Sequence, residues 1–417
     1  MTKPGAYSIY LIMEGVTSLC LATIFTVAAV YRINDAGLNP FQLVLVGTVL
    51  ETSAFFFEVP TGVLADTYSR RLSIIIGIFL LGAAAVFEGS IPLFGTILLA
   101  QVIWGLGYTF TSGATEAWIA DEIGELRAGH AYLRGAQVGQ VGALIGTFVS
   151  VGLASIRLNL PIVLGGGTII ALAIFLLLVM PEHGFQPAPR EERGSWRAMG
   201  QTFRSGVQAV RGRPLLITIL GIGAFFGASS EAFDRLWQAH FLENFRFPEL
   251  GAFEPVVWFG IINVGAMILS FVAAEVARRR VDTSSHLAVA RALLIINALL
   301  IASVVAFGLA GNFAVALGAY WAAYLLRRTN QPLYTAWINQ NVSPQVRATV
   351  FSMTSQSDAF GQIAGGPAVG AIGALFSLRA AMVVTGLLLS PALALYARSL
   401  RHAAAEPELP EALSPEV

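Results

Sequence analysis

Twelve long apolar runs constrain this chain more than any other feature of its sequence. Each run approaches the roughly 20 apolar residues that a helix needs to cross a bilayer core of about 30 Å. Only helices and closed barrels satisfy their backbone hydrogen bonds in lipid, and these runs are too long for barrel strands and do not alternate. The sequence therefore predicts an all-α membrane protein with twelve transmembrane helices in two six-helix bundles.

The composition agrees with a membrane protein and excludes several other classes. Charged residues make up 12% of the chain, about half the share of a soluble domain, and the mean hydropathy is +0.70. The formal net charge is zero, so nothing favours a nucleic-acid partner. Cys20 is the single cysteine, which excludes a disulfide or a cysteine metal site within one chain.

The predicted spans divide into two sets of six around one polar stretch. We expect an N-terminal bundle over 1–180, a cytoplasmic linker over 181–213 with an amphipathic helix near 196–210, a C-terminal bundle over 214–398 and a cytoplasmic tail over 399–417. The predicted spans are 6–30, 40–64, 72–91, 93–119, 132–154, 160–180, 214–239, 252–277, 286–309, 312–338, 348–372 and 379–398.

The basic residues predict the orientation. Of the 25 Lys and Arg residues, 17 fall on the side of the two termini and four within the spans. The remaining four, Arg32, Arg157, Arg246 and Arg379, fall on the other side. Basic loops stay in the cytoplasm, so both termini are expected there. Lys3 is the only lysine, which is typical of a GC-rich bacterial genome, and we expect the bacterial cytoplasmic (inner) membrane.

The turn between the second and third spans carries a recognisable motif. It reads Gly62-Val-Leu-Ala-Asp66-Thr-Tyr-Ser-Arg70-Arg71 and resembles the loop signature of the major facilitator superfamily. The matching turn of the second half, 274–280, also has an acidic residue followed by a basic cluster, as expected of an internal repeat. The resemblance implies a secondary transporter similar to the multidrug/proton antiporter-type members. It also implies a cytoplasmic gate network formed by Gly62, Asp66, Arg70, Arg71 and Asp121.

Small residues recur in the fifth and eleventh spans. Gly139, Gly142 and Gly146 are expected to pack the fifth helix closely against a neighbour. The eleventh span has Gly365 and Gly366 followed by Pro367 in the same role. The fifth span lacks the Gly-Pro pair of the drug exporters' antiporter signature. The fourth span has Gln101 where such exporters usually have an arginine.

Carboxyl groups lie within the apolar runs of the first half. Glu14 and Glu51 fall near mid-depth, and Glu58 lies seven residues after Glu51, on the same face of its helix. A carboxylate at the bilayer centre is costly, so such residues are functional candidates. A carboxyl without a cation in a low dielectric tends to hold a proton. We therefore predict that these three residues couple protons or line the substrate cavity.

The second half contains charges of both signs. Asp358 lies in the eleventh span, and the adjacent Arg327 and Arg328 lie near the middle of the tenth. Adjacent helical residues point about 100° apart, so at most one arginine can easily face Asp358 or the cavity. Two alternatives remain open, a structural Arg–Asp pair and a site that binds an anion. Asp234 and its neighbours Glu231 and Arg235 fall toward the outer end of the seventh span. They are either part of an external gate or charges solvated at the membrane interface.

Motifs of other protein classes are missing from the sequence. It has no phosphate-binding Gly-Lys-Ser loop and no zinc-type His–Glu pair, so neither ATP-driven transport nor an enzyme is supported, and no cofactor or metal is expected.

The leading hypothesis is proton-coupled export of a hydrophobic or cationic small molecule by a monomer in the lipid bilayer, as in drug-resistance efflux. The alternatives are a proton symporter or uniporter for a polar or anionic metabolite, and a transporter-like receptor that moves nothing.

Overall fold

The computed structural model describes residues 5–187, 214–249, 256–280, 285–342 and 344–405, and these residues form helices and no strand. The first half contains eight helices: α1 (Ala6–Phe25), α2 (Ala28–Asn34), α3 (Pro40–Thr67), α4 (Arg70–Ser90), α5 (Phe94–Thr111), α6 (Ala114–Ile123), α7 (Glu125–Ala154) and α8 (Leu160–Val179). The described helices of the second half are α10 (Pro214–Asn244), α11 (Val256–Arg280), α12 (His286–Leu309), α13 (Phe313–Asn341), α14 (Pro344–Leu375), α15 (Leu378–Leu388) and α16 (Ser390–Ala405).

These helices coincide with the predicted spans, and the predicted fold class is confirmed. The pairs α1–α2, α5–α6 and α15–α16 are each one predicted span with a local break. Gly113, with a positive φ of 70°, makes the break between α5 and α6. Over the described residues, nine helices are long and apolar enough to cross a membrane. The last helix runs to Ala405, beyond the predicted end at 398, and the predicted amphipathic helix near 196–210 lies outside the described residues.

Polar caps define where several helices begin. At the start of α3, the Asn39 side chain accepts a hydrogen bond from the Gln42 backbone, and the Gln42 side chain accepts one from the Asn39 backbone. This reciprocal capping box satisfies two backbone donors, and Pro40 favours the first helical position. Ser69 caps α4 by accepting from the Leu72 backbone at 2.9 Å. Such caps separate neighbouring spans with very short turns.

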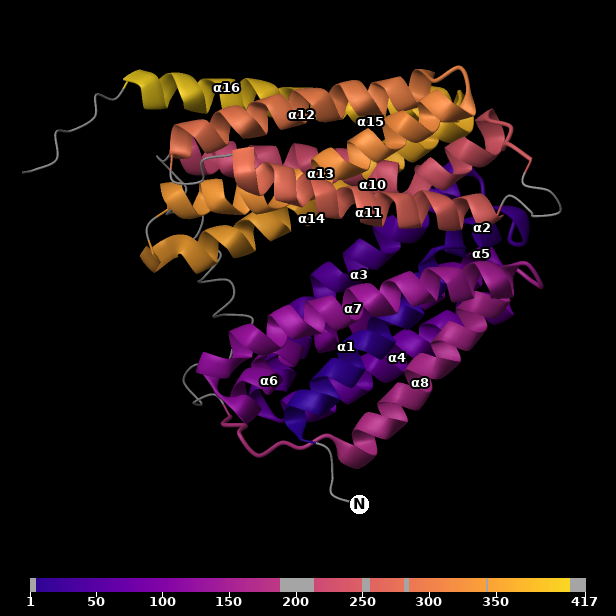
Figure 1. Ribbon diagram of the computed structural model, residues 1–417, viewed down its shortest axis with the longest axis vertical. Coiled ribbons are helices and arrows are strands. Elements are labelled where there is room, and N and C mark those ends of the chain that lie inside the picture. The colour runs from indigo at the N-terminus through magenta and orange to yellow at the C-terminus, as the bar shows by residue number, and fades with distance from the viewer. Residues whose placement is uncertain (1–4, 188–213, 250–255, 281–284, 343, 406–417) are drawn as a thin grey trace, which may run out of the picture.

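The two halves form separate bundles that converge at one end. In Figure 1, helices α1–α8 lie below α10–α16, and the two groups approach each other beside α2 and the start of α11. The first half has its own buried apolar core. The core of the second half extends onto the first half through Val30, Leu38, Leu43 and Val44, at the α2–α3 end. The halves therefore share an apolar core at this end, which we call the closed end.

Glycines permit the closest helix contacts within each half. On α7, a Cβ at Gly142 or Gly146 would collide with the backbone carbonyl oxygen of Gly15 or Leu19 on α1. On α14, a Cβ at Gly361 would meet the backbone of α10 in the same way. Helices α1 and α7 are the first and fifth spans of the first half, and α10 and α14 are the first and fifth spans of the second. The same small-residue packing thus repeats in both bundles, as expected of an internal repeat.

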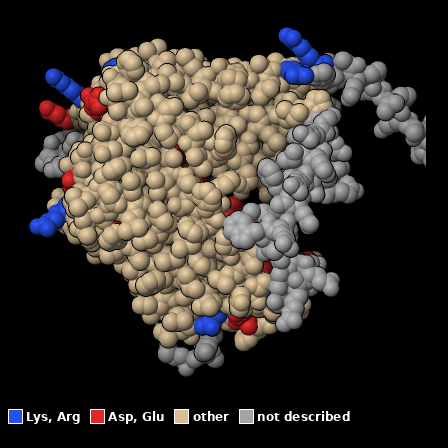
Figure 2. Space-filling model, turned by 180° about the vertical axis from the view of Figure 1, so that it is seen from behind, with Lys and Arg blue, Asp and Glu red and all other residues tan. Residues whose placement is uncertain are grey.

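The outer surface suits a lipid environment. Figure 2 shows one face on which uncharged residues cover the broad middle and charged side chains lie toward the margins. Large apolar side chains are exposed on several helices, among them Phe148, Ile174 and Leu178. Exposed apolar patches of this extent are atypical of a soluble monomer.

A packing test follows from two glycines of the same helix. Gly146→Ala places a methyl group against the Leu19 backbone, whereas a Cβ at Gly152 meets nothing within 4 Å. We expect Gly146→Ala to lower the stability by about 1–3 kcal/mol, as overpacking does. Gly152→Ala should leave the stability unchanged or raise it, because alanine favours the helix. Thermal unfolding in detergent checks this, and equal melting temperatures for the two variants would contradict it.

Candidate functional site

The closed end is held by close contacts between the two halves. A Cβ at Gly370 of α14 would meet Val44 of α3 at 3.0 Å, and a Cβ at Gly373 would meet Pro40 at 3.0 Å. On the other side of the interface, Gln238 of α10 donates a hydrogen bond to the backbone carbonyl of Thr26 at 3.0 Å. Toward the α3–α4 turn and the start of α1, the halves separate (Figure 1).

Two cavities lie between the halves at different depths. One, of about 980 Å³, is lined by α1, α7, α10, α11 and α13. The other, of about 470 Å³, is lined by α3, α5, α10, α13 and α14. Helix α10 runs toward the closed end. Its residues Ile222, Gly223 and Phe226 line the smaller cavity, and the later residues Asp234, Arg235, Trp237 and Gln238 line the larger one. The larger cavity is therefore nearer the closed end and is called the deep cavity, and the smaller one is called the vestibule.

The vestibule is lined by carboxyl groups that form no ion pair with a described residue. Its wall includes Glu51, Glu58 and Asp358, and none of the described residues that line it is Lys, Arg or His. Glu58 accepts a hydrogen bond from Gln356 across the interface at 3.2 Å, and Asp358 accepts one from Gln362 at 2.8 Å. The aromatic side chains of the wall are Phe55, Tyr108, Phe226, Tyr334 and Phe351. Carboxylates and aromatic faces both attract organic cations.

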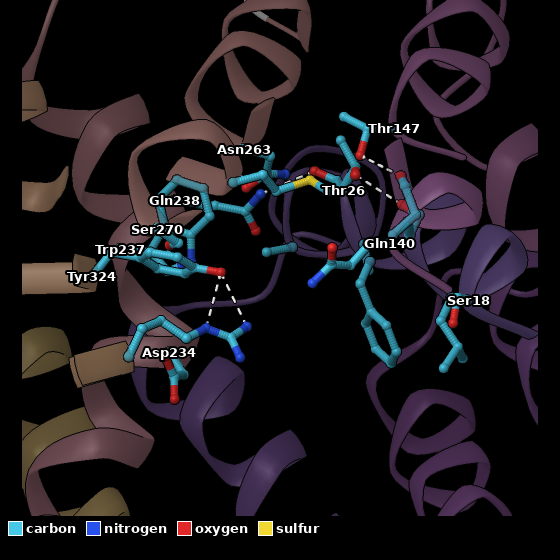
Figure 3. A pocket seen from close by; sticks show the side chains of 18 of the residues that line it. Ser18, Thr26, Gln140, Thr147, Asp234, Trp237, Gln238, Asn263, Ser270 and Tyr324 are labelled. Carbon is cyan, nitrogen blue, oxygen red and sulfur yellow. Dashed lines mark hydrogen bonds between the residues drawn. The ribbon is translucent and has the colours of Figure 1, made fainter. Parts of the chain in front are cut away.

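The deep cavity has polar walls from both halves. Figure 3 shows Ser18 and Gln140 of the first half facing Asp234, Trp237 and Tyr324 of the second. Its further polar side chains are Thr26, Thr147, Gln238, Asn263 and Ser270. Two of the charged candidates, Glu14 and Arg328, also line this cavity, together with Arg32 and Arg235. Of the six predicted cavity residues, Glu14 and Arg328 thus line the deep cavity, Glu51, Glu58 and Asp358 line the vestibule, and Arg327 is among the lining residues of neither.

Arg32 and Glu88 form a buried ion pair that the sequence analysis missed. Arg32, predicted to be an external loop residue, is only 5% exposed and binds both carboxylate oxygens of Glu88 on α4, at 2.7 and 3.1 Å. Gln101 of α5 donates to the same carboxylate at 2.7 Å. The predicted span ends at residue 30, whereas helix α2 continues to Asn34, so Arg32 belongs to the helix. Glu88 could have been found as an acid inside an apolar run.

The second half pairs its charges differently from what was expected. Arg327 binds both oxygens of Asp234 at 2.6 and 2.7 Å, so the structural Arg–Asp pair involves Asp234 instead of Asp358. Arg235 donates to Glu231 at 2.9 Å, and Glu231 is only 3% exposed. Glu231 is therefore buried inside the protein, whereas Asp234 is exposed and lines the deep cavity together with Arg235. Arg328 donates instead to the Tyr324 hydroxyl.

The Glu231–Arg235 pair lies directly against the first half. A Cβ at Gly47 of α3 would collide with the Glu231 carboxylate and the Arg235 guanidinium. Glu51 is one helical turn further along α3 and interacts electrostatically with both of these residues and with Asp358. Glu51 is therefore placed between the vestibule and an ion pair of the opposite half.

The predicted gate residues gather at the α3–α4 turn. Arg70 forms an ion pair with Asp121 of α6 and lies 3.7 Å from Asp66, and all three residues belong to the first half. Arg71 donates to the Leu177 carbonyl at 2.6 Å. A Cβ at Gly62 would meet nothing within 4 Å, so no close helix approach depends on this glycine in the observed conformation.

Glu182 also belongs to this turn, although the sequence analysis did not single it out. It accepts hydrogen bonds from the Ser69 hydroxyl at 2.7 Å and from the Arg71 backbone at 2.8 Å. A carboxylate at the start of α4 is favourable, because the N-terminus of a helix carries partial positive charge. The residue thereby fastens the end of α8 to the start of α4.

Comparisons with known proteins agree with this architecture. The family description Major Facilitator Superfamily matches residues 10–330, and the chain belongs to this superfamily. The predicted recognition is confirmed at the level of the superfamily, and the family is one of membrane transporters. Among curated proteins, an uncharacterized MFS-type transporter of Bacillus subtilis (strain 168), YxaM, is 26% identical over 369 residues, which cover 85% of this chain and 86% of that protein.

Several solved transporters share the fold. The nucleoside transporter NupG has a TM-score of 0.74 at 14% identity, covering 94% of this chain and 99% of its own. A bacterial homolog of the human lysosomal transporter Spinster, inward-facing and occupied, has a TM-score of 0.73 at 16% identity, covering 95% and 96%. The peptide transporter POT in complex with sulfate has a TM-score of 0.72 at 14% identity, covering 96% and 94%. At these identities the likeness shows the fold alone.

The buried Arg32–Glu88 pair predicts a large stability effect. Glu88→Ala leaves the Arg32 guanidinium buried without an ion-pair partner, which costs about 3–5 kcal/mol. The double variant Arg32→Met/Glu88→Met removes both charges and should be the more stable of the two. Thermal unfolding of the purified variants compares them. A double variant less stable than Glu88→Ala would contradict this account of the pair.

Proposed function

We propose that this transporter exports a hydrophobic or cationic small organic molecule in exchange for protons, by alternating access. The vestibule is the observation that carries this proposal, because three carboxyl groups and five aromatic side chains line it and no basic side chain does so in the described part of the chain. Such a wall attracts a desolvated organic cation electrostatically and through its ring faces. The polar deep cavity beyond it provides room for the cargo between the halves.

The proposed direction follows from the proposed topology. We place both termini in the cytoplasm of a bacterium, so the observed conformation, with its halves apart at the α3–α4 turn, is open to the cytoplasm. A cation in the cytoplasm then reaches the vestibule first. The gate network of Asp66, Arg70 and Asp121 lies at this open end, and we propose that it latches the halves when this end closes.

Competition for the same carboxyl groups provides the proposed coupling. A proton and an organic cation both neutralise a carboxylate in a low dielectric, so the arrival of one favours release of the other. Glu51 is the leading candidate, because it lines the vestibule and interacts with Glu231 and Arg235 of the opposite half. Glu14 is the second candidate and belongs to the deep cavity.

Cation binding tests the vestibule directly. We expect the purified protein to bind tetraphenylphosphonium, a permanent lipophilic cation, and Glu58→Gln or Asp358→Asn to weaken this binding about tenfold, equivalent to about 1.4 kcal/mol for one lost charge interaction. Glu116→Gln is the matched control, because this exposed acid of α6 lines neither cavity. Isothermal titration measures the affinities. Equal weakening by the control, or no binding to the wild type, would count against a cation site.

Proton coupling is tested in reconstituted vesicles. An imposed pH gradient should drive tetraphenylphosphonium against its concentration gradient through the wild type, with the cation and the protons moving in opposite directions. Glu51→Gln or Glu14→Gln should abolish this drive while gradient-independent exchange of the labelled cation persists, because exchange requires no net proton transfer. Undiminished proton-driven transport in both variants would exclude these residues as coupling groups. Movement of the cation in the same direction as the protons would indicate symport.

A further inference from the structure

Arg328 differs from the other arginines of the deep cavity. Three arginines line this cavity, and two of them bind carboxylates, Arg32 to Glu88 and Arg235 to Glu231. Arg328 makes no ion pair with a described residue. An arginine within a membrane span normally pairs with an anion or with backbone carbonyls. Arg328 is instead exposed to the cavity, so its guanidinium is available to a ligand.

The guanidinium is held in place but remains partly free. Its Nε and Nη2 atoms both donate to the Tyr324 hydroxyl, at 3.3 and 3.0 Å, and its carbon lies 5.3 Å from the centre of the Tyr324 ring. Figure 3 shows these two hydrogen bonds at the wall of the cavity. Nη1 has no partner among the described residues. Nη1 and Nη2 together can donate two parallel hydrogen bonds to a carboxylate or phosphate.

Nearby carboxylates do not compensate this charge. Asp234 lines the same cavity, but both of its oxygens accept hydrogen bonds from Arg327. Glu231 is bound by Arg235. After these pairs form, Arg328 is the one unneutralised cation that the described residues of the second half present to the deep cavity.

Glu14 presents the opposite charge from the first half. It lines the deep cavity from α1 and has no hydrogen bond or ion pair with a described residue. Uncharged polar groups complete the wall, including Gln140 of α7 and Asn263 of α11 (Figure 3). Among the described residues, the cavity therefore has one unpaired anion, Glu14, and one unpaired cation, Arg328, on opposite halves of the transporter.

We propose that Arg328 binds an anionic group of the cargo, so that the cargo carries a carboxylate or phosphate in addition to its cation. The cationic part of the cargo lies toward Glu14 and the anionic part binds Arg328, which links the two halves through one amphoteric molecule. Tyr324 is a positioning residue that fixes the plane of the guanidinium. This inference rests on the proposed transport of an organic cation and narrows its substrate class.

Three dyes with one ring system separate the two parts of the proposal. Rhodamine 123 is a cation, rhodamine 110 is the same cation with a free carboxylate, and fluorescein has the carboxylate without the cation. Binding to the full-length protein in detergent is measured by fluorescence anisotropy. We expect Arg328→Gln to weaken binding of rhodamine 110 and fluorescein about tenfold, as for one lost charged contact, and to leave rhodamine 123 unchanged. Arg328→Lys should retain part of the preference for carboxylate dyes, because lysine keeps the positive charge but cannot donate two parallel hydrogen bonds.

Arg327 provides the matched control. It is the adjacent arginine, but it is already bound to Asp234, so Arg327→Gln should lower the melting temperature without removing the preference for carboxylate dyes. Arg328→Gln breaks no ion pair and should melt close to the wild type. The same selective loss in both variants would overturn the assignment to Arg328.

The remaining outcomes distinguish this inference from the proposed function. If no dye binds the wild type, or if Arg328→Gln affects all three dyes equally or none, the anion site is wrong. If rhodamine 110 and fluorescein bind through Arg328 but rhodamine 123 does not bind, the anion site stands and cation transport fails. If rhodamine 123 binds and the carboxylate dyes show no dependence on Arg328, cation transport stands and the anion site fails.

Discussion

The free-energy cost of a charge in a lipid bilayer governs how this protein distributes its ionisable groups. An isolated charge at the bilayer centre costs at least about 2.5–3.5 kcal/mol on insertion scales. Arg32, Arg235 and Arg327 each meet this constraint with a carboxylate of the same half. The charges that remain unpaired, above all Glu14 and Arg328, line the space between the halves. Paired and unpaired charges therefore share the wall of the deep cavity, where Arg32, Asp234 and Arg235 are neutralised within their own half and Glu14 and Arg328 are not.

Glycine packing determines where these cavities can form. The α1–α7 and α10–α14 contacts bring backbones together within each half, and α3 and α14 do the same between the halves at the closed end. Close backbone contact replaces the hydrophobic driving force, which is absent between helices in lipid. Because Gly47 has no side chain, the Glu231–Arg235 pair fits against α3. The fold thus fixes the walls of the deep cavity and the vestibule by the positions of small residues.

Hydropathy and one loop motif predicted the fold well, because apolar run length and turn chemistry are local properties. The same reasoning found acids at mid-depth, and Glu51, Glu58 and Asp358 do share a cavity. It could not find the Arg327–Asp234 pair, because the rotation of α13 relative to α10 depends on packing between helices far apart in the sequence. The partners of a buried charge are a tertiary property, whereas its presence in a span is visible in the sequence.

Every ion pair among the described residues joins two groups of the same half, and Glu231–Arg235 joins two groups of the same helix. The halves meet at the closed end through apolar and glycine contacts and through hydrogen bonds such as Gln238 to the Thr26 carbonyl. When the closed end opens, these ion pairs can move with their bundles as neutral units. The barrier to that motion then comes mainly from exposing the apolar contacts of the closed end to water. The rate of the conformational exchange should therefore depend more on temperature than on ionic strength.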